Sequence, residues 1–319
     1  MIIKDKLEEI KIEKRPLILT VGNFDGLHRG HKKVIRKVIS RARESYGTSA
    51  LLTFEPHPRI FLHPDSAPPL LLTREEKIDI LDHWGLDYYI EIPFTIEFSQ
   101  IRAEDFLNQI WLFLNPKEVY VGEDFRFGLK REGNFSDINN FAEKMGSFAE
   151  AVKKLEISGK EVSSTLIRNC IENGDVEKAH LFLGRPFEIR GIVERGAERG
   201  REIGFATANI KIGDKIVPKR GVYSTLVDIK EEYLLPSVSN VGVRPTFSDI
   251  SEEILEIHII DKNIELYGKE IRCLFLHQIR EERKFSSVEE LKNQILKDKE
   301  VAKNKLLSSH LLKRKLFWG

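Results

Sequence analysis

Cysteine is scarce in this chain of 319 residues, and the two that it has, Cys170 and Cys273, lie far apart in the sequence. No CxxC pair is present, so neither a disulfide framework nor a zinc site is indicated. No apolar run approaches the roughly 20 residues of a membrane span, and the first residues lack the apolar region of a signal peptide. We therefore expect a cytoplasmic protein that has no membrane partner.

An excess of charge of one sign is also missing, because the formal net charge is only +1. This balance argues against a nucleic-acid partner bound by bulk electrostatics. Hydrophobic residues make up 41% of the chain and charged residues 32%, as in ordinary globular proteins. The length is sufficient for two domains with separate cores. Nothing in the composition specifies an oligomeric state, and small molecules are the expected partners.

The most informative stretch begins with a short apolar run at residues 17–21, which predicts a strand buried on both faces. Residues 22–28, which we call the phosphate turn, follow it and include Gly22 and Gly26. A helical pattern comes next, with His28 and His31 at its start, so that both rings can point the same way. Free N–H groups at a helix start favour anions, and the pattern therefore indicates a phosphate site.

Two plainer interpretations of His28 and His31 exist: part of a metal site, or two surface histidines that cap a helix. No further His or Cys stands at ligand spacing, which disfavours the metal. The buried strand and the glycine turn favour phosphate over simple capping. The sequence Gly-Asn-Phe-Asp-Gly-Leu-His-Arg-Gly-His at residues 22–31 resembles the signature of nucleotidyltransferases, in which both histidines contact nucleotide phosphates.

A second buried strand is expected at residues 50–54, which makes residues 17–54 a βαβ unit. Ligands of such sheets bind at the carboxyl ends of the strands, so Phe54 and His57 are candidates for a wall of the second substrate's pocket. The alternative is a stiff turn built by Pro56 and Pro58, which holds whatever His57 does.

Strand and helix patterns then alternate, which predicts an α/β domain with a parallel sheet. Residues 73–76 have the form of a capping box, residues 88–92 and 118–121 are expected strands, and residues 103–114 an expected helix. After the last strand, Asp124 is a candidate for a metal ion or a substrate hydroxyl, and Arg126 for phosphate. Alternatively, Phe125 and Phe127 simply alternate into the core.

Three hydroxyl residues at 163–165 open a short helix that runs to residue 172. Capping alone explains one hydroxyl. Ser164 and Thr165, with Arg168 one turn further on, give a second candidate phosphate-binding helix start, which suits a triphosphate held from two sides. A helix at residues 176–183 closes the expected first domain, 1–183, and the second domain is 184–319.

The second domain has short strand patterns at residues 189–193, 221–227, 255–260 and 271–277, and helical periodicity only from residue 288. This spacing predicts a small antiparallel β-barrel with a C-terminal helix. A glycine- and arginine-rich loop precedes Thr207 and Asn209, neutral oxygen ligands suited to Mg²⁺ in an ATP complex. Neither a Walker A motif nor a protein-kinase signature occurs in the chain.

The ordered motifs resemble the family of bifunctional prokaryotic riboflavin kinase/FMN adenylyltransferases, also called FAD synthetases. The resemblance extends from about residue 15 to about residue 303 and rests on many motifs in the same order, at residues 22–31, 54–58, 121–128, 163–168, 204–209, 221–223, 240–247, 266–268 and 280–285. It implies a Rossmann-like nucleotidyltransferase domain followed by a riboflavin kinase barrel. The implied reactions use ATP and Mg²⁺ to convert riboflavin to FMN and FMN to FAD, with release of pyrophosphate.

The resemblance also assigns roles to residues. Glu256 would be the general base for riboflavin, and His28, His31 and Arg168 would act in adenylyl transfer. ATP would be bound by Gly22, Phe24, Gly30, Ser164, Thr165, Gly204, Thr207 and Asn209, the last two also holding Mg²⁺, and the flavins by Phe54, His57, Asp124, Arg126 and Arg280. One departure is Ala206, where the family usually has proline; this change should loosen the loop slightly and leave kinase activity intact.

Other interpretations stay open at this point. One alternative is a nucleotidyltransferase of another substrate with a non-catalytic flavin-binding barrel. A flavin carrier or sensor without turnover is a second alternative, although the set of His28, His31 and Glu256 disfavours it. A nucleic-acid-binding barrel would need a basic, aromatic face, whereas the second half mixes acidic and basic residues evenly.

Overall fold

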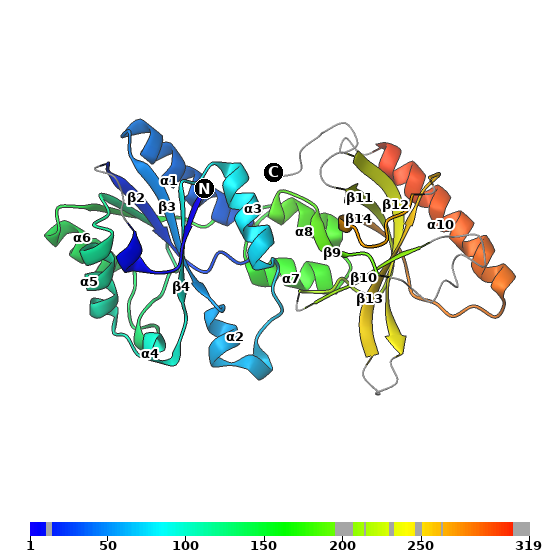
Figure 1. Cartoon of the computed structure of the whole chain (residues 1–319), viewed down its shortest axis with the longest axis horizontal. Helices are drawn as coiled ribbons and strands as arrows, with labels where there is room; N and C mark the ends of the chain where they lie inside the picture. Colours follow the sequence, from blue (N-terminus) through cyan, green and yellow to red (C-terminus); the bar gives the residue numbers. More distant parts are fainter. Residues whose placement is uncertain are drawn as a thin grey trace. The chain divides into compact units, whose positions relative to one another are not determined.

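The computed structural model describes residues 1–10, 15–194, 207–213, 215–229, 233–245, 251–262 and 264–308. They belong to two compact units, Met1–Ser163 and Ser164–Gly319 (Figure 1). The predicted ATP-binding residue Gly204 and the unusual Ala206 lie outside the described residues.

The first unit contains a six-stranded sheet in which all neighbouring strands are parallel. In spatial order the strands are β1 (Ile2–Lys4), β4 (Tyr88–Pro93), β3 (Thr48–Glu55), β2 (Leu17–Val21), β5 (Glu118–Gly122) and β6 (Phe148–Val152). The chain runs from β2 outward to β4, and then returns to place β5 on the other side of β2. The strand order therefore reverses between β2 and β5, where ligands of such sheets bind.

Helices cover both faces of this sheet, as the alternation of buried side chains along β2 requires. On one face Ile18 packs with Val34 and Val38 of α1 (Arg29–Glu44). On the other face Leu17 and Leu19 belong to a larger core with residues of α5 (Ala103–Phe113) and α6 (Phe135–Lys144). The α/β prediction is thus confirmed (Figure 1).

The remaining elements of this unit are short. They comprise η1 (Leu7–Glu9), α2 (Pro58–Leu62), η2 (Pro64–Ser66), α4 (Ile96–Ser99), η3 (Leu129–Arg131) and the pair β7 (Glu156–Ile157) and β8 (Lys160–Glu161). The predicted capping box is confirmed at the start of α3 (Arg74–Trp84): Thr73 Oγ1 accepts from the Glu76 N–H at 3.3 Å, and Glu76 Oε2 accepts from the Thr73 N–H at 3.0 Å.

The second unit begins with α7 (Ser164–Glu172) and α8 (Val176–Leu183), followed by a six-stranded antiparallel sheet. In spatial order its strands are β10 (Ala208–Lys211), β13 (Ser251–Ile259), β12 (Tyr233–Pro245), β11 (Gly221–Ile229), β14 (Glu270–Glu281) and β9 (Phe187–Ile192). The Glu194 N–H donates to the Asn209 carbonyl at 2.9 Å and links the two edges. The sheet therefore curls into a nearly closed barrel, as predicted.

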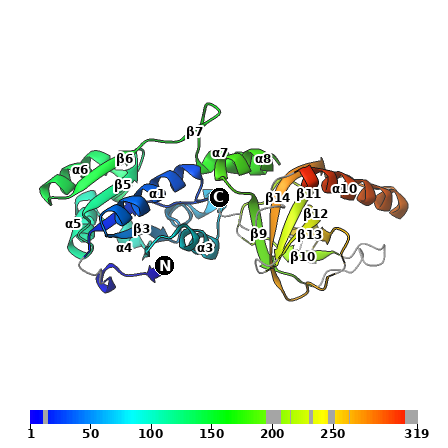
Figure 2. The same ribbon diagram turned by 90° about the horizontal axis from the view of Figure 1, so that it is seen from above.

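The barrel has an inner and an outer face with different partners. Aromatic rings fill the inside, where Phe275 contacts both Phe187 and Tyr223. Outside, α10 (Val288–Ser308) lies along the barrel (Figure 2), and its Ala302 and Leu306 pack against Leu226, Leu274, Leu276 and Ile260. The predicted C-terminal helix is thereby confirmed.

Candidate active sites

The phosphate turn connects the carboxyl end of β2 to α1, and β2 borders the place where the strand order reverses. Its backbone is strained, because two residues other than glycine adopt positive φ: Phe24 at 49° and Leu27 at 39°. Gly26, with φ at 86°, lies between them. Such strain costs of order 1–3 kcal/mol for each residue and concentrates at functional sites.

His28 and His31 stand together at the start of α1. Their rings stack with centroids 3.6 Å apart, and the edge of Phe24 meets the His31 ring at 5.2 Å. His28, only 5% exposed, caps the helix: its Nδ1 accepts from the His31 N–H at 3.2 Å. In a neutral imidazole the other nitrogen, Nε2, then carries the proton and is a donor. The prediction that both rings point the same way is confirmed.

Two glycines leave room for rings at this site, Gly30 for His28 and Gly22 for Phe24. A Cβ atom on Gly30 would lie 3.1 Å from both Nδ1 and Cε1 of His28. A Cβ atom on Gly22 would lie 3.1 Å from the Phe24 ring. Both distances are shorter than ordinary van der Waals contact, so Gly30 leaves room for the His28 ring and Gly22 for the Phe24 ring. The contact of Gly22, Phe24 and Gly30 with ATP stays a prediction.

The two candidates that follow β3 differ in their surroundings. Phe54 is buried in the core, where its ring meets those of Phe94, Phe98 and Phe106. His57 caps α2, its Nδ1 accepting from the Arg59 N–H at 3.2 Å. Both residues therefore have structural roles, and their contact with flavin stays a prediction.

The loop after β5 contains the other two flavin candidates of this unit. Asp124 is exposed, and its carboxylate lies 3.3 Å from the Lys154 ammonium; Arg126 is exposed as well. Phe127 belongs to the core and Phe125 stacks against it at 5.7 Å. The interpretation that the two phenylalanines serve the core is confirmed for Phe127 and partly for Phe125.

The sequence analysis missed a cluster of three charged residues near the carboxyl ends of β2 and β3: Lys77, Asp25 and Glu55. Burial lowers the pKa of Lys77 on α3, while the charges of Asp25 in the phosphate turn and of Glu55 oppose that lowering. Burial also raises the pKa of Glu55, at the end of β3. No motif signals this cluster, because its members lie far apart in the sequence.

The second candidate phosphate-binding helix start belongs to the second unit. Ser164 and Thr165 are the first two residues of α7, and Arg168 is buried one turn further on. The helix ends at Glu172, as predicted, and Gly174 follows it with φ at 82°. The assignment of these three side chains to ATP stays a prediction.

Three polar residues lie side by side across three strands of the barrel, and we call them the polar row. Glu256 on β13 is in register with Asn209 on β10 and with Asn240 on β12. Directly opposed residues of an antiparallel pair point to the same face. Asn209 is only 6% exposed, and Asn240 Nδ2 donates to Glu256 Oε2 at 3.4 Å. Thr207, just before β10, is exposed.

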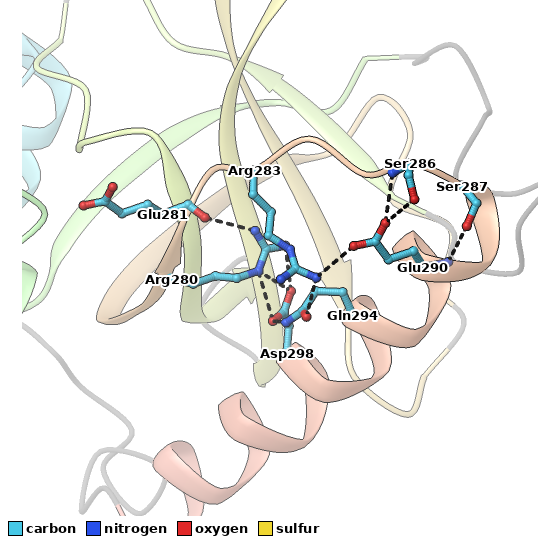
Figure 3. A network of polar contacts seen from close by, with 8 residues as sticks. All are labelled: Arg280, Glu281, Arg283, Ser286, Ser287, Glu290, Gln294 and Asp298. Carbon is cyan, nitrogen blue, oxygen red and sulfur yellow. Dashed lines mark hydrogen bonds and ion pairs between the residues drawn. The ribbon is translucent and has the colours of Figure 1, made fainter.

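Arg280 on β14 extends the same alignment, because both Asn240 and Arg280 are in register with Val222 on β11. Its guanidinium forms a bidentate ion pair with the buried Asp298 of α10, Nη2–Oδ2 being 2.9 Å and Nε–Oδ1 3.2 Å (Figure 3). Gln294 also donates to Asp298, at 2.7 Å. The structure thus shows Arg280 joining α10 to the barrel, and its predicted flavin contact stays untested.

A parallel sheet with stacked histidines beside its topological switch point, joined in one chain to a barrel with a strand-borne glutamate, is the arrangement expected of a two-domain transferase of nucleotide phosphates. Comparisons of the chain with known protein families agree with this class. The FAD synthetase family model matches residues 10–166, and the riboflavin kinase family model matches residues 183–306. The chain belongs to the family of bifunctional riboflavin kinase/FMN adenylyltransferases.

Relatives match over most of their length. The bifunctional riboflavin kinase/FMN adenylyltransferase of Haemophilus influenzae is 37% identical over 286 residues, covering 89% of this chain and 92% of that protein. The Bacillus subtilis protein of the same name is 37% identical over 298 residues, covering 92% and 93%. These matches favour the bifunctional reading over another nucleotidyltransferase with a non-catalytic barrel.

One solved structure has the same fold. A crystal structure named as a macrolide-efflux protein from Streptococcus pneumoniae superposes with a TM-score of 0.86 and 30% identity, covering 95% of this chain and 98% of that one. Within the part of this chain that the structure describes, no helix has both the length and the apolar character needed to cross a membrane.

Proposed function

We propose that the first unit adenylylates FMN at the His28–His31 pair and that the second unit phosphorylates riboflavin at the polar row. The single observation that carries this proposal is the presence of two separate polar constellations, one on each folded unit. Both reactions use ATP, but the phosphorus atom that is attacked differs between them.

Adenylyl transfer needs no protein nucleophile. A phosphate oxygen of FMN attacks the α-phosphorus of ATP in line, a new P–O bond forms, and the bond from the α-phosphorus to the bridging oxygen breaks to release pyrophosphate. The donors of His28 and His31, with the first N–H groups of α1, stabilise the charge that develops on the phosphate oxygens. Ser164, Thr165 and Arg168, at the start of α7, are separately proposed to bind phosphates of ATP.

The flavin of this reaction is assigned to the loops at the carboxyl ends of β3 and β5. His57 and the exposed Asp124 and Arg126 are the proposed contacts there. Phe54 is proposed to contribute only as part of the apolar wall, since its ring is buried among other aromatic rings.

In the barrel, Glu256 is the proposed general base. Its carboxylate takes the proton of the riboflavin 5′-hydroxyl while that oxygen attacks the γ-phosphorus of ATP, and ADP leaves. Arg280 is a proposed contact for flavin, and Gly204 a proposed contact for ATP.

Magnesium fits the residues beside this base. Asn209 offers a neutral oxygen and is in register with Glu256, and Thr207, two residues earlier in the chain, offers another. Neutral and carboxylate oxygens are the donors that Mg²⁺ prefers together with substrate phosphates. When bound, the ion neutralises charge on the phosphates of ATP. The two residues are therefore proposed to hold the ion.

A cytoplasmic location is also proposed, from the composition alone.

Two variants test the assignment. His28→Ala should lower FAD formation from supplied FMN by a factor on the order of 10²–10³ while leaving FMN formation intact. Glu256→Gln should lower FMN formation by a factor on the order of 10²–10⁴, to a small residual rate, while supplied FMN is still adenylylated. His63→Ala and Glu270→Gln, which change exposed side chains, are the matched controls and should leave both rates unchanged. Equal loss of both activities in either test variant would contradict the assignment of one site to each unit.

A further inference from the structure

The Glu256 carboxylate is flanked on both sides by amide side chains. Asn209 on β10 and Asn240 on β12 are each directly opposite Glu256 in the register. The sequence alone does not reveal the pairing of Asn240 with Glu256, because Asn240 precedes Glu256 by 16 residues. Of the two asparagines, Asn240 forms a hydrogen bond to the carboxylate, from Nδ2 to Oε2 at 3.4 Å.

The chain leaves a defined space for this amide. Gly242 lies two residues further along β12, on the same face as Asn240. A Cβ atom on Gly242 would lie 3.3 Å from Asn240 Nδ2 and 3.5 Å from Glu282 Oε1. On the other side Asn240 is in register with the buried Val222 of β11. The amide therefore lies beside Gly242, where a larger residue would crowd it, and it is hydrogen-bonded to the Glu256 carboxylate.

We propose that Asn240 is a positioning residue of the riboflavin kinase reaction. Its amide holds one carboxylate oxygen of Glu256, so that the other oxygen faces the hydroxyl that loses its proton. This inference rests on the proposed role of Glu256 as the general base. Asn240 itself touches neither substrate nor reacting atoms in this role.

An amide suits this task better than a cation. A carboxylate has two oxygens with about four acceptor sites, so a hydrogen bond to one leaves the other able to take a proton. A neutral donor fixes the side chain and favours the carboxylate over the carboxylic acid only modestly. A lysine or arginine at this position would form a charge-assisted bond, which is about twice as strong, and would weaken the base.

Other charged groups face the same region and belong to the expected pH response. Glu282 approaches Gly242, His258 lies on the same face of β13 as Glu256, and Arg280 is held by Asp298. Because these groups are unchanged in an Asn240 variant, a difference from the unaltered protein reports the Asn240–Glu256 contact.

The test uses Asn240→Asp, which keeps the shape of the side chain and replaces its donor by a second carboxylate. Two carboxylates in contact share a proton, so the acid limb of the FMN-forming rate should move up by a pH unit or more. At neutral pH kcat should fall about 10- to 100-fold, with the KM for riboflavin changed much less. Adenylylation of supplied FMN, measured on the same full-length chain, should be unchanged.

Asn240→Leu and Gly242→Ala guard against misfolding of the first variant. Leucine removes the donor without adding charge, so kcat should fall while the acid limb moves less. The alanine should displace the amide by a few tenths of an ångström and give a smaller loss in kcat. In a Glu256→Gln background, Asn240→Leu should add no further loss, because the base it positions is gone.

The inference is overturned if Asn240→Asp and Asn240→Leu keep the kcat and the acid limb of the unaltered protein. It is also overturned if Asn240→Leu lowers the residual rate of the Glu256→Gln variant as much as it lowers the unaltered rate. A fully active Glu256→Gln variant would instead refute the proposed base, whatever the Asn240 variants do.

Discussion

Replacing Gly30 by alanine should displace the His28 ring while changing the free energy of unfolding only slightly. The new Cβ atom would lie 3.1 Å from two atoms of that ring, so the ring must move by a few tenths of an ångström. The ring is fixed by the hydrogen bond to the His31 N–H at 3.2 Å and by the stack on the His31 ring at 3.6 Å. Any such movement therefore weakens the helix cap and displaces the proposed phosphate donor.

The expected magnitudes differ for stability and catalysis. Alanine in a helix is favoured over glycine by about 0.5–1 kcal/mol, which offsets the weakened cap, worth about 1 kcal/mol. The free energy of unfolding should thus change by less than about 1 kcal/mol. A misplacement of 1 Å costs about 10²-fold in rate, so a few tenths of an ångström should lower FAD formation roughly 10-fold.

The assay measures thermal unfolding and both products on the full chain. Gly213→Ala is the matched control, because its Cβ atom would meet nothing within 4 Å. FMN formation should stay at the rate of the unaltered protein in both variants. Unchanged FAD formation in Gly30→Ala would refute the claim that the place of the His28 ring matters, and an equal fall of both products would point to general damage.

Three further predictions concern stability. Phe54→Ala should destabilise the first unit by about 3–5 kcal/mol in chemical denaturation, and a mild loss would contradict its role in the core. Asp298→Ala should cost about 3–5 kcal/mol in the second unit and lower FMN formation, because it leaves Arg280 without its bidentate partner; unaltered stability would show that the pair is dispensable. Burial raises the pKa of Cys273 from 9.0 to about 12, so the thiol loses its proton at a lower pH in the unfolded chain than in the folded one. The free energy of unfolding should therefore fall as the pH rises from about 9 toward 12, by roughly 1.4 kcal/mol per pH unit. Cys273→Ala should remove this part of the dependence of the unfolding free energy on pH, and identical slopes in the variant and the unaltered protein would refute the prediction.

Local patterns were sufficient to predict that the rings of His28 and His31 lie together. The spacing of His28 and His31 at a helix start follows from helical geometry alone, and their stacked rings confirm it. The apolar run at Leu17–Val21 was equally clear, because a strand buried on both faces has no polar residues to obscure it.

Strands with an unusual pattern were missed. β12 was not predicted, because Ser237 and Ser239 point into the barrel, where a hydrophobic residue is normally expected. There they exchange hydrogen bonds with Thr225 at 2.8 and 2.7 Å, which makes the polar side chains acceptable in the core. β1 was missed as well, since three residues at a sheet edge give too little periodicity to recognise.

Long-range pairing was beyond the reach of the sequence. The register that places Asn209 and Asn240 on either side of Glu256 depends on how three strands align, and a shift of one residue would put them on opposite faces. In the same way, nothing in the sequence around Arg280 reveals that Asp298 on α10 pairs with it.

Mixing two variants tests most directly whether one chain contains two separate sites. His28→Ala and Glu256→Gln chains are incubated together with riboflavin, ATP and Mg²⁺, and FMN and FAD are separated. The account predicts that the mixture forms FAD, because FMN made by the first variant is adenylylated by the second, whereas neither variant alone converts riboflavin to FAD. Absence of FAD from a mixture in which FMN accumulates would contradict it.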